Sequence, residues 1–222
     1  MFYAIGRIIG LTLGYPLQLL FFKRRTYYEY GEDGSRTNVF KGGKLIISNH
    51  VNMFDYVLTS FIVYPRKLNV VASEHAFANP FFREGVKFFG AIKANRVSKN
   101  MKFIDESVRV ITERRQLVQI FPEARNTPDG KIHDFKPSYL VIAYRAGAPI
   151  VPIITDGNYG VFKRTSVIIG QEIDVSPFFK TDARTPSREE LAAANEYVHS
   201  KVLELREELE RLKKQKNGKK KK

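Results

Sequence analysis

The sequence predicts one α/β domain, with a largely parallel mixed sheet flanked by helices and an N-terminal hydrophobic helix that anchors it to a membrane. Short apolar runs rich in β-branched residues alternate with segments of helical periodicity. With 222 residues, 43% of them hydrophobic, the chain can build one sizeable core. The N-terminal 22 residues are almost entirely apolar, which sets them apart from the rest.

The N-terminal stretch, residues 1–22, would form a helix ~33 Å long, close to the thickness of a membrane hydrocarbon core. Three basic residues follow at 23–25, as expected on the cytoplasmic side of an anchor. Arg7 and Pro16 weaken a clean span, so this helix is either embedded or interfacial. A buried helix of the globular core is the alternative. We expect residues 1–25 to be a membrane anchor segment.

The body of the chain alternates between two kinds of segment. Strands are expected at 44–48, 68–72, 116–121, 150–154 and 166–170. Helices are expected between them, at about 54–64, 79–89, 99–114 and 137–146. Strands that alternate with helices form parallel sheets, whose functional sites lie at the carboxyl ends of the strands.

The main domain is expected to occupy residues 26–212 and to end in a long amphipathic helix. This helix opens near Ser187, which forms a capping-box pattern with Glu190. Its apolar residues keep one face as far as Leu212. Residues 213–222 hold seven lysines and no acid, so we expect a disordered tail attracted to anionic membranes. A tail that only aids solubility is the alternative.

The formal charge of +14 suits a nucleic acid, an anionic membrane surface or an anionic small substrate. Nucleic acid is disfavoured, because the lysine tail lacks interleaved aromatic residues and the body has no nucleic-acid motif. The absence of cysteine excludes disulfides, thiolate zinc sites and cysteine nucleophiles. No metal site is expected either, since the histidines lack ligand-like spacing; they are His50, His75, His133 and His199.

Residues 46–56, IISNHVNMFDY, place His50 just past a strand and Asp55 in the first turn of the next helix. In that arrangement Asp55 can hold the imidazole Nδ1–H and leave Nε2 free to accept a proton. A plainer interpretation is that Asn52 caps the helix while Asp55 complements its dipole. Ser48 as a nucleophile beside His50 is a further alternative, although no hydrolase motif accompanies it.

Two other expected strand ends add charged residues to the same rim. GAIKANR contributes Lys93 and Arg96, and IFPEARN contributes Glu123 and Arg125. Cations at this place suit a phosphate, which an arginine can bind through two hydrogen bonds. The alternatives are a solvated surface charge for Lys93 and a structural ion pair with an arginine for Glu123.

Four segments in order resemble the sequence blocks of the glycerolipid acyltransferases, most closely the bacterial 1-acyl-glycerol-3-phosphate acyltransferases (PlsC-like). The segments are NHVNMFD (49–55), GAIKANR (90–96), FPEAR (121–125) and APIVPI (148–153). The resemblance covers roughly residues 38–175, and four blocks in order are far more specific than one.

The resemblance implies that His50 is the general base and that Asp55 orients it. It also implies phosphate binding by Arg96. The remaining candidates for substrate binding from these blocks are Asn49, Lys93, Glu123 and Arg125. The third block departs from the family pattern, with Ala124 in place of glycine and the arginine one position early, which bears on the acceptor head group.

The implied activity moves a fatty acyl group from an acyl thioester, acyl-CoA or acyl-ACP, to the free hydroxyl of lysophosphatidic acid. The product is phosphatidic acid, and no cofactor is needed beyond the acyl co-substrate. The expected location is the cytoplasmic face of the cell membrane, the bacterial inner membrane, with acyl carrier protein as a possible partner. The alternatives are an acyltransferase for another lysophospholipid and a non-catalytic protein that binds phospholipid surfaces.

Overall fold

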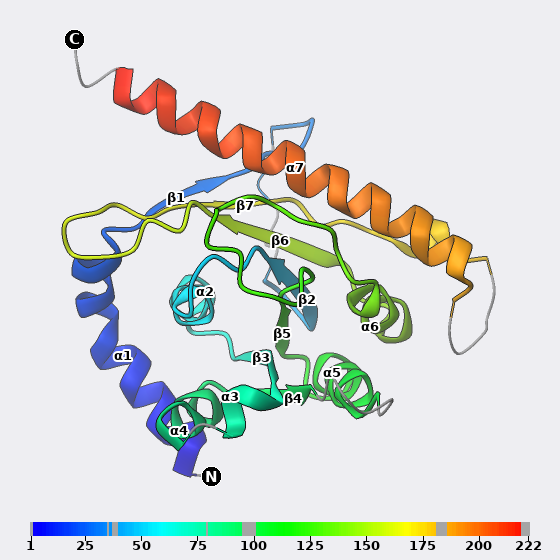
Figure 1. Ribbon diagram of the computed structural model, residues 1–222, viewed down its shortest axis with the longest axis horizontal. Coiled ribbons are helices and arrows are strands. Elements are labelled where there is room, and N and C mark those ends of the chain that lie inside the picture. Colours follow the sequence, from blue (N-terminus) through cyan, green and yellow to red (C-terminus); the bar gives the residue numbers. More distant parts are fainter. Residues whose placement is uncertain are drawn as a thin grey trace.

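A computed structural model of the protein describes residues 2–34, 36, 40–78, 80–94, 101–180 and 186–218. Its seven strands form one sheet in the order β1-β7-β6-β2-β5-β3-β4 (Figure 1). The strands are β1 (Arg25–Tyr28), β2 (Lys44–Ser48), β3 (Leu68–Ser73), β4 (Ile92–Ala94), β5 (Leu117–Ile120), β6 (Ile150–Thr155) and β7 (Ser166–Ile169). All neighbouring strands are parallel except β6 and β7, so the predicted α/β fold with a largely parallel, mixed sheet is confirmed.

The helices cover both faces of this sheet (Figure 1). They are α1 (Phe2–Phe22), α2 (Asp55–Val63), α3 (Glu74–Ala78), α4 (Pro80–Phe88), α5 (Lys102–Thr112), α6 (Ser138–Ala146) and α7 (Arg188–Gly218), with a 3-10 turn at Ser176–Phe178. Buried residues of α5, α6 and α7 share one core cluster, and those of α1 and α2 share the other. Each core therefore fills the space between the sheet and one helix layer.

The central strand β2 shows why these residues form a buried parallel strand. Leu45 and Ile47 belong to one core cluster, whereas Ile46 belongs to the other. Side chains that alternate between two apolar layers make a strand hydrophobic throughout, as in parallel sheets covered on both faces. The amide nitrogen of the buried Gln119 on β5 bonds within the fold, because Nε2 donates to Ser48 Oγ at 2.9 Å and to Thr59 Oγ1 at 3.1 Å.

The helix α1 docks on the body and leaves one side exposed. Leu11, Phe22 and the polar Arg7 are buried, and the Arg7 guanidinium donates to the Leu68 carbonyl at 3.0 Å. Its other side carries exposed apolar residues, namely Ile8, Ile9, Leu13, Leu17, Leu19 and Leu20. Among the described helices, none has the length and apolarity that crossing a membrane requires. The alternative of a buried helix of the globular core holds only in part, because these apolar side chains of α1 are exposed.

The helix α7 begins as the sequence predicts and ends later. Ser187 N donates to the Glu190 carboxylate at 2.8 Å, and Glu190 N donates to Ser187 Oγ at 3.1 Å, so the capping box is present. The helix continues to Gly218, which makes the expected disorder from residue 213 onward wrong for 213–218. Lys213 packs, since its Nζ lies 3.1 Å from the carboxylate of Asp156. Residues 219–222 lie outside the described part of the chain.

The register of the sheet brings three strand ends together. Ile47 of β2 pairs with Ile120 at the end of β5, and Ser48 pairs with Ile153 near the end of β6. The segments that follow these strands therefore meet at one edge of the sheet, where parallel folds place their sites.

Candidate active site

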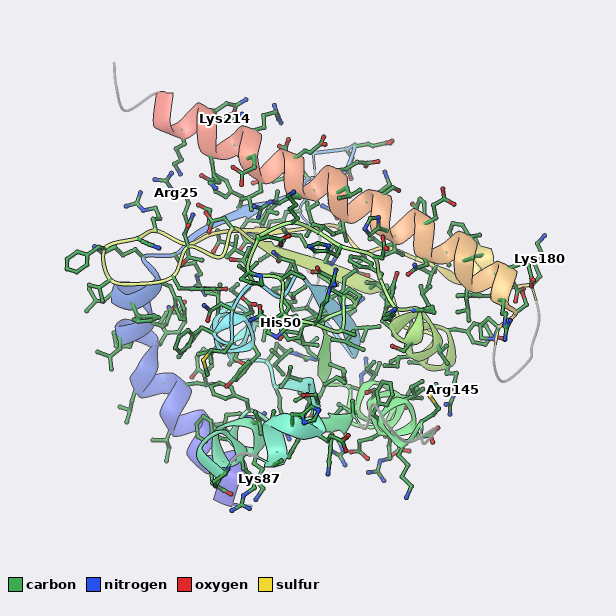
Figure 2. The ribbon with its side chains drawn as sticks, viewed as in Figure 1. Arg25, His50, Lys87, Arg145, Lys180 and Lys214 are labelled. Atoms are coloured by element: carbon green, nitrogen blue, oxygen red, sulfur yellow. The ribbon has the colours of Figure 1, made fainter. Side chains whose placement is uncertain are left out.

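His50 lies two residues beyond the end of β2, beside α2, near the centre of the molecule (Figure 2). Its Nδ1 is 2.9 Å from Asp55 Oδ2, so the predicted hydrogen bond between the two side chains is present. Within the described residues, no hydrogen bond reaches Nε2 of the ring. The imidazole is therefore held at one nitrogen, and the other can take up a proton.

Asp55 is the first residue of α2, and its side chain is only 2% exposed. Oδ2 also accepts a hydrogen bond from the backbone N–H of Asn52 at 2.8 Å. Oδ1 accepts a very short hydrogen bond from the hydroxyl of Tyr159. Both oxygens of the buried carboxylate thus have partners, which such a group requires. The N-cap residue of α2 is Phe54 and not Asn52, although Asn52 Oδ1 accepts a hydrogen bond from the Phe54 N–H at 3.2 Å just before the helix.

An aromatic stack fixes the plane of the His50 ring. The imidazole lies on the Phe121 ring with centroids 4.1 Å apart and an angle of 19° between the planes. The following loop is tied to the same residue, since Thr127 donates to the His50 carbonyl from its N–H at 2.7 Å and its hydroxyl at 3.1 Å. The segment after β5 therefore supports the histidine through the ring of Phe121 and through hydrogen bonds to the His50 backbone.

Tyr159 is a site residue that the sequence reasoning missed. Its ring packs edge-on against Phe22 of α1 at 5.5 Å and against Phe54 at 6.5 Å between centroids. Burial, and then the negative charge of Asp55, raise the pKa of the Tyr159 hydroxyl far above its usual value. The hydroxyl therefore stays protonated and donates to the carboxylate at every physiological pH.

Asn49 is buried, and its side chain forms hydrogen bonds with the end of β6. Its Nδ2 donates to the Thr155 carbonyl at 2.9 Å, and its Oδ1 accepts from the Thr155 N–H at 3.0 Å. Both polar groups are thus engaged with the end of β6, and substrate binding by Asn49 stays a prediction. Ser48 is equally buried and accepts from Gln119. This contact does not activate Ser48 as a nucleophile, because it has no base as its partner.

Glu123 is 3% exposed and accepts a hydrogen bond from the backbone N–H of His133 at 3.2 Å. Burial raises the pKa of this carboxyl group, partly offset by hydrogen bonds that favour the charged form. The described residues include no arginine paired with Glu123, so the alternative of a structural ion pair is not supported there. Arg125 lies exposed on the same loop, and Ala124 between them has φ of +53°.

Another predicted cation, Lys93, lies at the far edge of the sheet. Lys93 is exposed on β4, whose position is separated from β2 by β5 and β3. Arg96 falls outside the described residues. Within the described part of the chain, no group of three or more potential metal-ligating side chains is close enough to hold a metal ion. The structure thus brings together His50, Asp55 and Tyr159, with the Phe121–Glu123 segment beside them.

A histidine held by a buried aspartate at the carboxyl edge of a largely parallel sheet is an arrangement that suits general-base catalysis in an α/β enzyme. The chain belongs to the acyltransferase family, because the family model described as Acyltransferase matches residues 28–156. The match includes both His50 and Asp55 and ends three residues before Tyr159.

Two relatives are 1-acyl-sn-glycerol-3-phosphate acyltransferases. The protein from Bacillus subtilis is 25% identical over 77% of this chain and 84% of its own length. The protein from Cocos nucifera is 22% identical over 74% of this chain, which spans about half (49%) of that relative. The crystal structure of the lysophosphatidate acyltransferase PlsC from Thermotoga maritima matches with a TM-score of 0.57. It is 17% identical, over 90% of this chain and 78% of that one, and this likeness supports the fold.

Proposed function

We propose that this protein transfers a fatty acyl group from an acyl thioester to the free hydroxyl of lysophosphatidic acid, giving phosphatidic acid. Family membership and the activity named for the relatives support this reaction. The single observation that carries the chemistry is the 2.9 Å contact between His50 and Asp55, which leaves Nε2 as the free nitrogen of the imidazole.

In the proposed mechanism, Nε2 of His50 takes the proton of the acceptor hydroxyl as the oxygen attacks the thioester carbonyl. A new C–O bond forms, the tetrahedral intermediate collapses, and the C–S bond breaks. The thiolate leaves with the proton carried by the imidazolium, so the histidine returns to its neutral form. Asp55 stabilises the transient imidazolium, and Tyr159 holds the second carboxylate oxygen. The reaction requires no cofactor besides the acyl co-substrate.

We assign the phosphate of the acceptor to Arg125, with Arg96, which the family resemblance implies, as a second candidate. Arg125 is exposed on the loop that is tied to His50, and Arg96 belongs to the segment after β4. A guanidinium group can bind two phosphate oxygens at once, which would hold the glycerol backbone in a fixed orientation.

The exposed side of α1 supports association with the cytoplasmic face of a membrane. Its apolar side chains include Leu13 at 69%, Leu17 at 66% and Leu20 at 65% exposure. Apolar residues grouped on one helix side favour the interface between lipid head groups and acyl chains. Both substrates carry fatty acyl chains, so this placement would bring the site to them. We expect replacing all three leucines by asparagine to move the protein into the soluble fraction, whereas Leu203→Asn on α7 should not.

The decisive experiment incubates purified protein with lysophosphatidate and either acyl-CoA or acyl-ACP, and identifies the product by mass. Phosphatidate formed by the wild type and absent with His50→Ala is the expected result. A panel of other lysophospholipids in the same assay tests the alternative acceptors. If the wild type forms no acylated product from either donor with any acceptor, a non-catalytic phospholipid-binding role replaces the proposal.

A further inference from the structure

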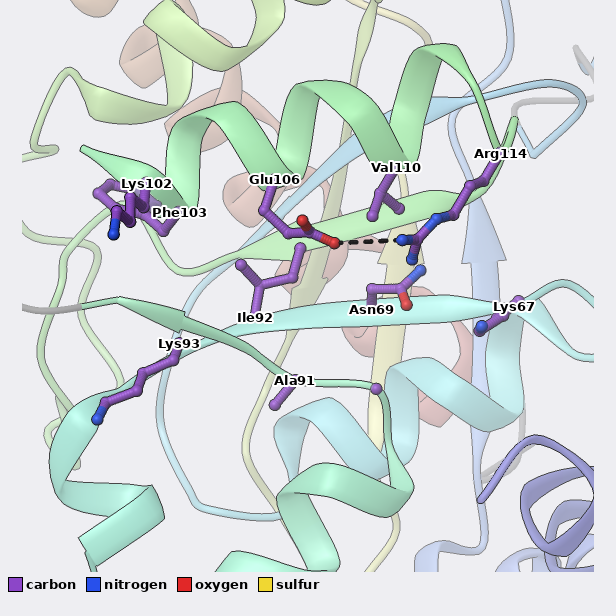
Figure 3. Close-up of a pocket in the computed structure, with 11 residues that line it drawn as sticks. Lys67, Asn69, Ala91, Ile92, Lys93, Lys102, Phe103, Glu106, Val110 and Arg114 are labelled. Carbon is purple, nitrogen blue, oxygen red and sulfur yellow. Dashed lines mark ion pairs between the residues drawn. The ribbon is translucent and has the colours of Figure 1, made fainter. Parts of the chain in front are cut away.

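A groove of about 470 Å³ runs between the edge strand β4 and helix α5 (Figure 3), and His50 is not among the residues that line it. Lys93 and Lys102 lie at one end of it, and Lys67 and Arg114 lie at the other (Figure 3). Asn69 and Glu106 line the stretch between them. The groove is therefore a second surface feature that the proposed mechanism does not use.

The side chains of the groove are unbalanced in charge. Among the lining residues that the structure describes, four are cationic and one, Glu106, is acidic. Glu106 is itself shared, because its carboxylate contacts both Arg109 and Arg114. Within the described residues, no carboxylate pairs with Lys67. At this end of the groove, the charge of Lys67 therefore has no acidic partner among the described residues, and Arg114 shares Glu106 with Arg109.

The environment of Lys67 adds to this imbalance. Arg7 is buried at 6% exposure, and its guanidinium donates to the carbonyl of Leu68, the residue next to Lys67. Burial, followed by the charges of Arg7 and Arg114, lowers the pKa of Lys67. Like charges held this close destabilise one another, and a bound anion would relieve the repulsion.

The dimensions of the groove and its distance from His50 limit the shape of the anion that can bind there. Ala72 pairs with Lys93, and Lys67 precedes Ala72 by five residues, so the two cationic ends are ~16 Å apart along the strands. His50 follows β2, which is three strand spacings from β4, or ~14 Å across the sheet. A ligand that reacts at His50 and also reaches this groove must be long.

The acceptor is too short for this. In lysophosphatidate, the phosphate is attached to the carbon next to the one that carries the free hydroxyl. A hydroxyl placed at His50 therefore keeps its phosphate near the histidine, and the groove is out of its reach. An acyl-CoA thioester has the opposite shape, because the pantetheine arm separates its reacting carbonyl from its phosphates.

We propose that this groove binds the phosphates of the nucleotide end of a coenzyme A thioester, with the pantetheine arm crossing the rim towards His50. The inference rests on the proposed acyl transfer and deepens it by naming the donor. Lys67 and Arg114 supply the charge at the distal end, and Arg114 can bind a phosphate through two hydrogen bonds. Lys93 then contacts the donor, not the acceptor.

The test compares two donors on one enzyme. Acyl-CoA carries the nucleotide phosphates, whereas the matching acyl-pantetheine thioester lacks them. We expect the double variant Lys67→Gln with Arg114→Gln to raise KM for acyl-CoA roughly tenfold, as loss of phosphate contacts does, and to leave KM for acyl-pantetheine unchanged. The control removes the same charge elsewhere, with Lys201→Gln and Arg211→Gln on the outer side of α7, and should leave both KM values unchanged.

A third variant acts in the opposite direction. Glu106→Gln removes the one acid of the groove and should lower KM for acyl-CoA, a gain that misfolding cannot imitate. Direct binding is measured as the rise in Tm that free coenzyme A produces in the wild type. Free pantetheine should produce no rise, and the double variant should lose the response to coenzyme A while folding normally without ligand.

Equal effects of the groove variants on both donors would overturn the proposal, and so would an unchanged KM for acyl-CoA. Transfer from acyl-ACP together with no response to coenzyme A would assign the groove to another anion and overturn it as well. Anionic vesicles that abolish the coenzyme A response by competition would point to a lipid phosphate instead. A wild type that transfers from neither donor, yet is stabilised by coenzyme A, would reject the proposed function and leave the groove assignment standing.

Discussion

The His50 site and the groove beside β4 differ in whether their charged side chains have partners within the protein. At the site, the buried carboxylate of Asp55 receives hydrogen bonds from His50, Asn52 and Tyr159. In the groove, Lys67 lies near two arginines and has no acidic partner among the described residues. The chain itself completes the first arrangement and leaves the second to a ligand. The catalytic side chains are thus preorganised at the His50 site, whereas the cations of the groove remain available to bind a ligand.

The largest effect is expected at the base. His50→Ala removes the group that accepts the hydroxyl proton, and we expect kcat to fall about 1,000-fold, within the range that general-base catalysis supplies. The control is His75→Ala, an exposed histidine on α3, which should keep full activity. Turnover and Tm are measured for both variants. Near-normal turnover in His50→Ala would contradict the proposed mechanism.

The next effect is expected at the carboxylate. Asp55→Asn keeps the shape of the side chain but presents an amide to three donors, so the imidazole loses its orienting partner. We expect a fall in kcat of about 100-fold and a loss of stability of about 1–3 kcal/mol from the mismatched buried contacts. Asp105→Asn, which breaks an exposed ion pair with Arg145, is the matched control. An Asp55→Asn enzyme as active as that control would contradict the assigned role.

A smaller effect separates positioning from packing. Tyr159→Phe removes only the hydroxyl that holds Asp55 Oδ1, and we expect kcat to fall about tenfold with KM unchanged. Tyr139→Phe is the control, because that buried hydroxyl donates to Asn195 far from the site. Both variants should lose about 1 kcal/mol of stability. Equal activity of the two variants, measured as kcat and KM at matched stability, would reduce Tyr159 to a structural residue.

The smallest effect is expected from salt. Charges exposed in the groove are screened within a Debye length of ~8 Å at physiological ionic strength, whereas the buried pair at the site is screened much less. Raising the salt concentration should therefore increase KM for acyl-CoA a few-fold and leave kcat unchanged. The acyl-pantetheine donor should show no such dependence. A fall in kcat with salt, at constant KM, would show that the catalytic site, and not the groove, is the salt-sensitive region.

Most of the sheet could be predicted from the sequence, because strands buried on both faces are continuous apolar runs. The strands β2, β3, β5, β6 and β7 lie within two residues of their expected positions. The edge strand β1 was missed, since Arg25–Tyr28 is short, polar and only partly buried. Its pairing with β7 depends on residues about 140 positions away, which local periodicity does not register.

The local part of the site could be predicted as well. His50 and Asp55 are five residues apart, so a strand end followed by a helix turn suffices to bring them together. The partners from distant segments could not be found this way. Tyr159 donates to Asp55, and the backbone of Thr155 bonds with both polar groups of the Asn49 side chain. Both contacts form because β6 lies next to β2 in the sheet. The predicted end of α7 was wrong for the same reason, because Lys213 forms an ion pair with Asp156, which is distant in the sequence.

The hydrogen bond between Tyr159 and Asp55 also has a consequence for how the protein matures. It joins residues 104 positions apart, and β2 pairs on one side with β5 and on the other with β6, the later of the two in the chain. Contacts of such long sequence separation form late and slowly during folding. A growing chain on the ribosome therefore has no complete site until β6 and Tyr159 have emerged. In refolding, we expect catalytic turnover to return with the slowest phase, well after the helices have formed.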